Sequence, residues 1–277
     1  MLKNKKILVV GVIRNGEKTI QPEISNLRNV FGDFSEIHWL IIESDSEDKT
    51  IQRLEELSQA IDNFHYRSLG RLAEKMPLRT ERLAFCRNIY LDEIRNNAFY
   101  SNFEYFAVAD LDGVNNLLTL DGVRTCFEQN MWDVCTANQL GNYYDIWALR
   151  HPIWSPGDCW EQYRYLNQFV KSAEGSSNLL YATVYSKMVV IPLEAEWIEV
   201  ESAFGGLAIY KRKVLLEDNI EYIGLNKNGE EICEHASLHL GITQNGYKIF
   251  INPKLINTDY TEHTVGLKPK EKLRLYI

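Results

Sequence analysis

The chain has 277 residues, of which 45% are hydrophobic and 25% charged, and its formal net charge is −8. This composition is typical of a folded globular protein, and the negative charge argues against nucleic acid as the main partner. Five cysteines without a CxxC pair indicate reduced thiols and exclude a disulfide framework or a zinc ribbon. The N-terminal apolar run is too short for a signal peptide, and no stretch reaches about 18 apolar residues. We therefore expect a cytoplasmic protein without a transmembrane segment, at most peripheral to a membrane.

Strands and helices are predicted to alternate through the first half of the chain. Continuous apolar runs at Lys6–Ile13 and Ile37–Ile42 are typical of strands buried in a parallel sheet. Further strands are predicted at 64–69, 105–109 and 134–137, and apolar residues at helical spacing predict helices at 20–31, 51–57, 78–99 and 119–130. This order predicts an α/β fold with a mostly parallel, Rossmann-like sheet flanked by helices on both faces.

The second half of the chain has a less regular pattern. Residues 142–171 are rich in Trp, Tyr and Pro and indicate irregular structure. Strands are predicted at 188–192 and 206–210, a helix at 234–245 that Gly246 ends, and a last short strand at 248–252. No repeat or Pro/Gly/Ser-rich linker interrupts the sequence, so we expect a single domain over 1–277.

Two aspartates follow one of the predicted buried strands directly. Asp110 and Asp112 end the segment YFAVADLD, and ligands bind beyond the carboxyl ends of strands in open parallel sheets. Two carboxylates one residue apart supply hard oxygen ligands for a divalent cation, Mn²⁺ or Mg²⁺, which can also hold a diphosphate. Asp110 is expected to contact the ribose of the nucleotide or the metal, and Asp112 the metal itself. An isolated Asp-x-Asp is also common in turns, but its position after a strand favours metal binding here.

Other predicted strand ends carry charged residues that suit a nucleotide. Arg14, Arg82 and Arg87 are candidates to bind a diphosphate, because guanidinium groups match phosphate oxygens. Arg82 and Arg87 diverge by about 140° on an ideal helix and cannot both face one ligand directly. Glu43 and Asp45 follow the second strand, where an acidic side chain either accepts hydrogen bonds from a ribose or base or caps the next helix.

Four segments in this order resemble the GT-A family of nucleotide-sugar glycosyltransferases: VVGVIRNGEKT, IIESDSEDKT, RTERLAFCRN and FAVADLDG. Three later segments are similar to the fungal capsule-associated α-mannosyltransferase group and its bacterial relatives: YYDIWALRHP, ESAFGGLAIYKR and CEHASLHLGITQNGYKIFINPKL. Together they extend from Ile7 to Leu255. The resemblance implies a GT-A fold in which residues 1–140 bind the nucleotide sugar and residues 141–277 form an irregular acceptor-binding half with a C-terminal lid.

The resemblance also implies roles for residues near the C-terminus. GT-A enzymes often recruit a third metal ligand there, and His263 in TDYTEHT is the candidate. Glu234 opens the predicted helix after the acceptor strand, where inverting GT-A enzymes often place the catalytic base; otherwise it favours the helix dipole. His235 is assigned to the acceptor pocket. His235 and His239 are spaced like a zinc-binding pair, but the HExxH pattern needs a Glu where Ala236 stands.

An aromatic and charged cluster is the remaining candidate for sugar binding. Tyr144, Asp145, Trp147 and Arg150 offer rings for the apolar faces of a sugar and charges for its hydroxyls; the alternative is a core cluster with one buried Asp–Arg pair. Gly205-Gly206 permits close approach of the backbone to a ligand, or marks a strand bulge.

These features predict a metal-dependent glycosyltransferase that moves a sugar, mannose by resemblance, from a nucleotide-sugar donor to a glycan or other hydroxyl acceptor. A sugar nucleotidyltransferase is the enzymatic alternative, but GVIRNGEK is a poor version of its Gly-rich phosphate loop. A non-catalytic carbohydrate-binding protein is the other alternative, and it does not need two carboxylates at a strand end.

Overall fold

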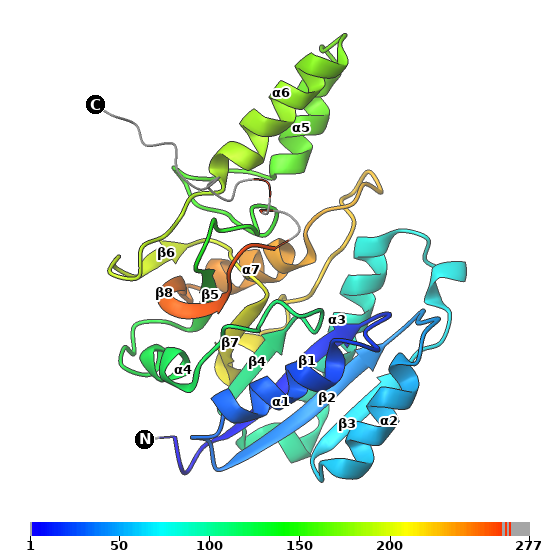
Figure 1. Ribbon diagram of the computed structural model, residues 1–277, viewed down its shortest axis with the longest axis vertical. Helices are drawn as coiled ribbons and strands as arrows, with labels where there is room; N and C mark the ends of the chain where they lie inside the picture. The colour runs from blue at the N-terminus through cyan, green and yellow to red at the C-terminus, as the bar shows by residue number, and fades with distance from the viewer. Residues whose placement is uncertain (1, 262–263, 265, 267–277) are drawn as a thin grey trace.

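The computed structural model describes residues 2–261, 264 and 266. One eight-stranded sheet runs through them, in the order β3-β2-β1-β4-β7-β5-β8-β6 (Figure 1). The strands are β1 Lys6–Ile13, β2 Glu36–Glu43, β3 Phe64–Ser68, β4 Tyr105–Ala109, β5 Val134–Gln139, β6 Ile198–Val200, β7 Leu207–Lys211 and β8 Ile249–Thr258. The α-helices are α1 Ile20–Val30, α2 Thr50–Ala60, α3 Arg79–Asn96, α4 Leu120–Cys126, α5 Cys159–Asn167, α6 Ala173–Thr183 and α7 Glu234–Gln244. Short 3-10 helices cover Leu72–Glu74, Ala98–Asn102, Tyr185–Lys187 and Arg212–Leu215.

The sheet changes direction at β7. Strands β3, β2, β1 and β4 pair in parallel, whereas β7 lies antiparallel between β4 and β5. Strand β8 pairs in parallel with β5 and antiparallel with β6. Because β4 and β7 run in opposite directions, the last residue of β4, Ala109, pairs with the first residue of β7, Leu207. The turn before β7 therefore lies beside the residues that follow β4.

Helices cover both faces of the sheet, as the alternation of strands and helices predicts. Helices α1, α2 and α4 pack on one face, where Ile7 and Val9 of β1 join their core. Helices α3 and α7 pack on the other face with Leu8 and Val10, which point the opposite way along the same strand (Figure 1). Residues 6–13 read as a continuous apolar run because both faces of β1 are buried.

The strands and helices predicted for the first half form, whereas the second half differs from the prediction in several places, among them strand β6, which was not predicted. No strand forms at 188–192: Val190 makes only an isolated bridge with Asn142, and the run is anchored in the core by the buried side chains of Met188 and Ile191 while Val190 is 53% exposed. The last strand, predicted to be short, has ten residues. The region predicted to be irregular contains helix α5, and α6 follows it.

Helices α5 and α6 form a hairpin that projects from the body of the molecule (Figure 1). Asp158 caps α5 by accepting the backbone N–H groups of Trp160 and Glu161, both at 2.9 Å. The same carboxylate pairs with Arg150 at 2.9 Å, which attaches the hairpin to the loop after β5. Within the described residues no helix has both the length and the apolar character needed to cross a membrane.

Candidate functional site

The backbone holds Asp110 firmly at the end of β4. Its N–H donates to the carbonyl oxygen of Gly206 at 2.9 Å, and its own carbonyl accepts from Nδ2 of Asn115 at 2.8 Å. Gly206 adopts φ +88°, and a Cβ there would lie 2.8 Å from the hydroxyl of Tyr144. The glycine is therefore required for the close approach of the turn before β7 to the end of β4.

A buried polar network supports the loop that carries Asp112. Glu23 on α1 accepts the N–H of Asn115 at 3.1 Å, and burial raises the pKa of this carboxyl. Asn257 on β8 donates from Nδ2 to Oδ1 of Asn115 at 3.2 Å and to the carbonyl of Gly205 at 2.7 Å. The loop is thus held by α1 and β8, while Asp112 itself is exposed to solvent.

Negative charge is concentrated around Asp110, whose side chain is 32% exposed. Burial is the largest cause that raises the pKa of Asp110, to about 7; the nearby Arg87 lowers it, and Asp112, Asp145 and Glu234 raise it further. The phenol of Tyr144 has a strongly raised pKa, because it is buried and because Asp110 and Asp145 lie close to it. A cation bound among these carboxylates would relieve their mutual repulsion.

The oxygen atoms of Asp110 and Asp112 suit a hard divalent cation that also binds the phosphate oxygens of a substrate. In the part of the chain that the structure describes, no three His, Cys, Asp or Glu side chains form a ready metal-binding group. Asp110 and Asp112 supply carboxylate oxygens, so the remaining donors would be phosphate oxygens and water. Mg²⁺ and Mn²⁺ sites on substrate diphosphates are commonly of this kind, whereas a structural zinc site is not.

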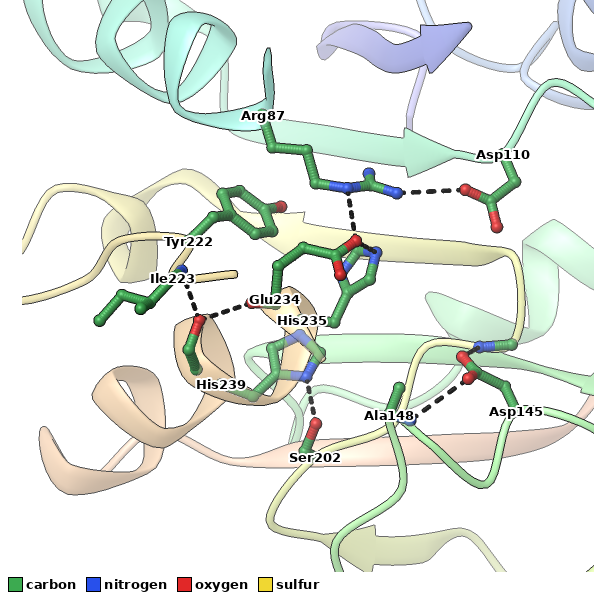
Figure 2. Close-up of polar contacts among 12 residues, drawn as sticks. Arg87, Asp110, Asp145, Ala148, Ser202, Tyr222, Ile223, Glu234, His235 and His239 are labelled. Atoms are coloured by element: carbon green, nitrogen blue, oxygen red, sulfur yellow. Dashed lines mark hydrogen bonds and ion pairs between the residues drawn. The ribbon is translucent and has the colours of Figure 1, made fainter. Parts of the chain in front are cut away.

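Arg87 on α3 lies between two of these acidic groups and is only 3% exposed (Figure 2). Its Nη2 donates to Oδ1 of Asp110 at 3.3 Å, and its Nε donates to Oε1 of Glu234 at 3.1 Å. The guanidinium carbon lies 5.6 Å from the ring centroid of Phe204 and 5.8 Å from that of Tyr222. Burial opposes its charge, but Tyr90, Glu234 and Asp110 outweigh burial and raise its pKa well above the usual value.

The side chains of Glu234 and His235, at the start of α7, lie beside the guanidinium group of Arg87 (Figure 2). The ring of His235 stacks on Phe204 with centroids 3.7 Å apart, and its Nε2 lies 3.9 Å from Oε1 of Glu234. Neither ring nitrogen has a hydrogen-bond partner among the described residues. Burial, helped by Arg87 and His239, lowers the pKa of His235 far below its usual value, so the ring is neutral.

His239, one turn further along α7, has a structural role. Its Nδ1 lies 2.9 Å from the hydroxyl of Ser202, and its Nε2 lies 2.8 Å from the hydroxyl of Tyr210. Burial lowers its pKa to about 3, which keeps the ring neutral. Both nitrogens are engaged within the protein, and this does not favour a zinc-binding His235–His239 pair.

The aromatic and charged cluster predicted from the sequence divides into two parts. Asp145 faces the candidate site, because its Oδ2 accepts the N–H of Gly205 at 3.0 Å. Trp147 and Arg150 instead donate to Oδ2 of Asp158, at 3.0 Å and 2.9 Å, at the base of the α5–α6 hairpin. Arg150 therefore pairs with Asp158, the N-cap of α5, at 2.9 Å.

A second group of polar residues lies at the ends of β1 and β2. Glu43 is buried and accepts the N–H of Ser46 at 2.9 Å and the hydroxyl of Ser68. Asp45 adopts φ +61° and accepts the N–H of Ala73 at 2.8 Å. Such a left-handed conformation is uncommon outside glycine and is often found at functional sites.

Two of the predicted arginines flank Asp45. Arg82 lies 3.6 Å from its Oδ2, and Arg14 donates from Nε to its carbonyl oxygen at 3.2 Å. Arg14 is exposed, while Arg82 also donates to the carbonyls of Met76 and Pro77. Arg87 is not part of this group, so the predicted divergence of Arg82 and Arg87 holds in the structure.

His263, the predicted third metal ligand, lies outside the described residues. Asn257 and Thr258 are buried and belong to β8, so a C-terminal lid that starts at about Asn257, as the polar end of the sequence suggests, does not fit the structure. Sequence reasoning did not identify Glu23, Asn115 and Phe204. Asn115 follows Asp112 by only three residues, but nothing in the sequence shows that its amide reaches back to Asp110.

Comparison with known proteins supports the fold. No family model and no curated protein matches the chain. Among solved structures 205 chains match. TarS from S. aureus, residues 1–349 with UDP-GlcNAc, is 14% identical, with a TM-score of 0.50, over 93% of this chain and 60% of that one. A second structure of S. aureus TarS is 14% identical, with a TM-score of 0.50, over 89% of this chain and 35% of that one.

A third match is the mannosyltransferase PcManGT from Pyrobaculum calidifontis, solved with GDP-Man and Mn²⁺. It is 13% identical, with a TM-score of 0.49, over 92% of this chain and 56% of that one. The chain thus spans roughly half the length of the structures it matches, between 35% and 60%. At these identities the likeness to the two TarS structures, both with a TM-score of 0.50, establishes the fold alone: the chain has a GT-A-like α/β fold. Membership in the fungal capsule-associated group stays a prediction.

Proposed function

We propose that this protein is a metal-dependent glycosyltransferase that uses a nucleotide-sugar donor. The observation that carries the proposal is the convergence of Asp110, Asp112, Asp145 and Glu234 at one edge of a GT-A-like sheet. Four acidic groups from three segments, with a buried arginine among them, concentrate negative charge where a cation would bind and would also neutralise a diphosphate. All five cysteines are unpaired thiols, which supports a cytoplasmic setting.

The donor is assigned to the first half of the chain, residues 1–140. Asp110 and Asp112 would hold Mn²⁺ or Mg²⁺, with His263 as a further ligand, and the cation would stabilise the negative charge of the departing diphosphate. Arg14 and Arg82 are the proposed contacts to phosphate. Glu43 and Asp45 belong to the nucleotide side in this proposal, where they order the loop after β2.

The acceptor is assigned to the second half, residues 141–277. An acceptor hydroxyl oxygen bonds to the anomeric carbon as the bond from that carbon to the diphosphate oxygen breaks, and the nucleoside diphosphate leaves with the electron pair. If the reaction inverts configuration, Glu234 takes the hydroxyl proton; if it retains configuration, the leaving phosphate oxygen takes it. Tyr144, Asp145 and His235 would line the sugar or acceptor pocket, whereas Trp147 and Arg150 support the pocket from the base of the hairpin.

Release of nucleoside diphosphate tests this function. The protein would be incubated with Mn²⁺ and, separately, UDP-GlcNAc, GDP-mannose and UDP-glucose, with and without a mixture of simple glycosides as acceptors. Release of UDP or GDP that needs Mn²⁺ and rises with acceptor is the expected result, and GDP release would support the mannosyl specificity suggested by the sequence. Release of pyrophosphate from a nucleoside triphosphate and a sugar 1-phosphate would instead identify a nucleotidyltransferase. Sugar binding without either product would indicate a carbohydrate-binding protein.

A further inference from the structure

Arg87 makes direct contacts to both sides of the proposed reaction. Its Nη2 donates to Asp110, a proposed cation ligand, and its Nε donates to Glu234, the proposed acceptor-side carboxylate (Figure 2). The first carboxylate follows β4 directly, the second is at the first residue of α7, and both contact a single guanidinium group that is 3% exposed. A buried guanidinium is stabilised by its ion pairs. If the ion pair with one carboxylate weakens, the ion pair with the other carboxylate must change in strength as well.

We propose that Arg87 is a positioning residue that couples cation binding at Asp110 to the placement of Glu234. A divalent cation and the guanidinium are both attracted by the carboxylate of Asp110, so a cation bound there competes with Arg87. When its contact with Asp110 weakens, Arg87 retains its hydrogen bonds to Glu234 and Tyr90. It also retains its cation–π contacts with the rings of Phe204 and Tyr222. Donor loading then strengthens the Arg87–Glu234 ion pair and fixes the acceptor-side carboxylate before transfer.

The coupling is reciprocal, and this distinguishes it from a purely structural ion pair. If cation binding tightens the hold of Arg87 on Glu234, a weaker hold on Glu234 must weaken cation binding by the same factor. Because this coupling needs a cation at Asp110, it rests on the proposed function. Cation affinity measured without donor or acceptor reports the coupling separately from activity.

Titration with Mn²⁺ alone, followed by the EPR signal of free Mn²⁺, is the decisive measurement. Arg87→Gln removes the competing charge, so the dissociation constant for Mn²⁺ should fall by about fivefold or more, while turnover at saturating Mn²⁺ decreases. These opposite effects are not expected if Arg87 only supports the fold. Arg95→Gln is the matched control: Arg95 lies on the same helix and donates to the carbonyls of Leu215 and Glu217, away from Asp110. It should leave Mn²⁺ affinity unchanged.

Glu234→Asp tests the other side and keeps the protein's charge. The shorter side chain withdraws from Nε of Arg87, the guanidinium relies more on Asp110, and the dissociation constant for Mn²⁺ should rise by about fivefold. A simple electrostatic attraction between Glu234 and the cation would leave this variant close to wild type. Far-UV circular dichroism checks that each variant is folded. If Arg87→Gln does not fold, the Mn²⁺ affinity of Glu234→Asp alone tests the coupling.

The possible results distinguish the proposed function from the proposed coupling through Arg87. Wild-type protein that binds no Mn²⁺ at millimolar concentration, either alone or with UDP or GDP, overturns the metal-dependent function and the coupling with it; if Mn²⁺ binds only with the nucleotide, the variants are compared with that nucleotide present. Wild-type binding that Glu234→Asp leaves unchanged, or that a folded Arg87→Gln leaves unchanged or weakens, overturns the coupling alone. Cation binding that shifts as expected in a protein without transferase activity supports the coupling and rejects the function.

Discussion

The carboxylate of Asp145 accepts the backbone N–H of Gly205 at 3.0 Å and so joins the loop after β5 to the turn before β7. The next residue of that turn, Gly206, accepts the N–H of Asp110 through its carbonyl. Two consecutive glycines with φ +68° and +88° therefore carry hydrogen bonds from both acidic segments. The geometry of the candidate site depends on a turn that only glycine can form without strain.

Gly206→Ala is expected to lower both stability and activity. Its Cβ would lie 2.8 Å from the hydroxyl of Tyr144 and from a methyl group of Val114, at a φ that side chains rarely adopt. The backbone strain alone costs about 1–3 kcal/mol of unfolding free energy, and the clash displaces Asp110. Gly229→Ala is the control, because φ is +77° there and no atom lies within 4 Å of the added carbon. Urea unfolding should show a loss in both variants, but only Gly206→Ala should lose transfer.

Asp112→Asn should abolish Mn²⁺-dependent transfer and leave the fold intact. The side chain is exposed, so the substitution removes one charged ligand oxygen without disturbing the core. Asp121→Asn on α4 removes another exposed charge and should leave transfer unchanged. Mn²⁺ titration and turnover in both variants check this. Wild-type Mn²⁺ dependence in Asp112→Asn would remove this residue from the metal site.

His263→Ala tests the proposed third ligand. The dissociation constant for Mn²⁺ should rise about tenfold while the midpoint of thermal unfolding without metal stays the same, because the role proposed for this imidazole is to bind the metal. His65→Ala, at an exposed position of β3, is the comparison. Equal Mn²⁺ affinity in His263→Ala and wild type would show that Asp110 and Asp112 act without it.

The raised pKa of Asp110 predicts how stability depends on pH. The pKa is about 7 in the folded protein and 3.8 in the unfolded chain, so the folded state binds more protons between these values. The contribution of Asp110 to the free energy of unfolding is therefore greatest at low pH, and it decreases as the pH rises from about 4 to about 7. Asp110→Asn cannot ionise, so its stability relative to wild type should increase over this range. Urea unfolding without metal at pH 5 and pH 7.5 measures it, and an opposite trend would show that Arg87 dominates the titration.

Much of the fold follows from local patterns in the sequence. Apolar runs predict β1, β2 and β4 because strands buried on both faces tolerate few polar residues. The antiparallel insertion of β7 between β4 and β5 is not predicted, since pairing partners depend on contacts far apart in sequence. Helix α5 is missed because its aromatic residues Tyr163 and Tyr165 have no clear 3.6-residue pattern; its N-cap, Asp158, was the available signal.

The candidate site could be predicted only where a strand end identifies it. Asp110 and Asp112 follow an apolar strand, so their place at the sheet edge was foreseeable. The contact between Arg87 and Glu234 spans 147 residues and has no sequence signature. Trp147 and Arg150 were predicted to share a site with Asp145 because they are close in sequence. Asp158 accepts hydrogen bonds from both, which places them at the base of the hairpin.

Glu234→Gln should reduce turnover while affinity for the nucleotide sugar at saturating Mn²⁺ changes little. The side chain is buried at the start of α7, where it accepts from Nε of Arg87 while Asp110 accepts from Nη2 (Figure 2), and glutamine keeps nearly the same shape. If Glu234 is the base, the loss should be about 10²–10⁴-fold, the usual contribution of acid–base catalysis. The anomeric configuration of the product must be determined by NMR alongside the kinetics, because a retaining enzyme passes the proton to the leaving phosphate and should lose less activity.

Glu199→Gln on the exposed edge strand β6 is the control and should behave as wild type. A Glu234→Gln enzyme that loses donor binding but turns over bound donor normally would place Glu234 on the nucleotide side instead.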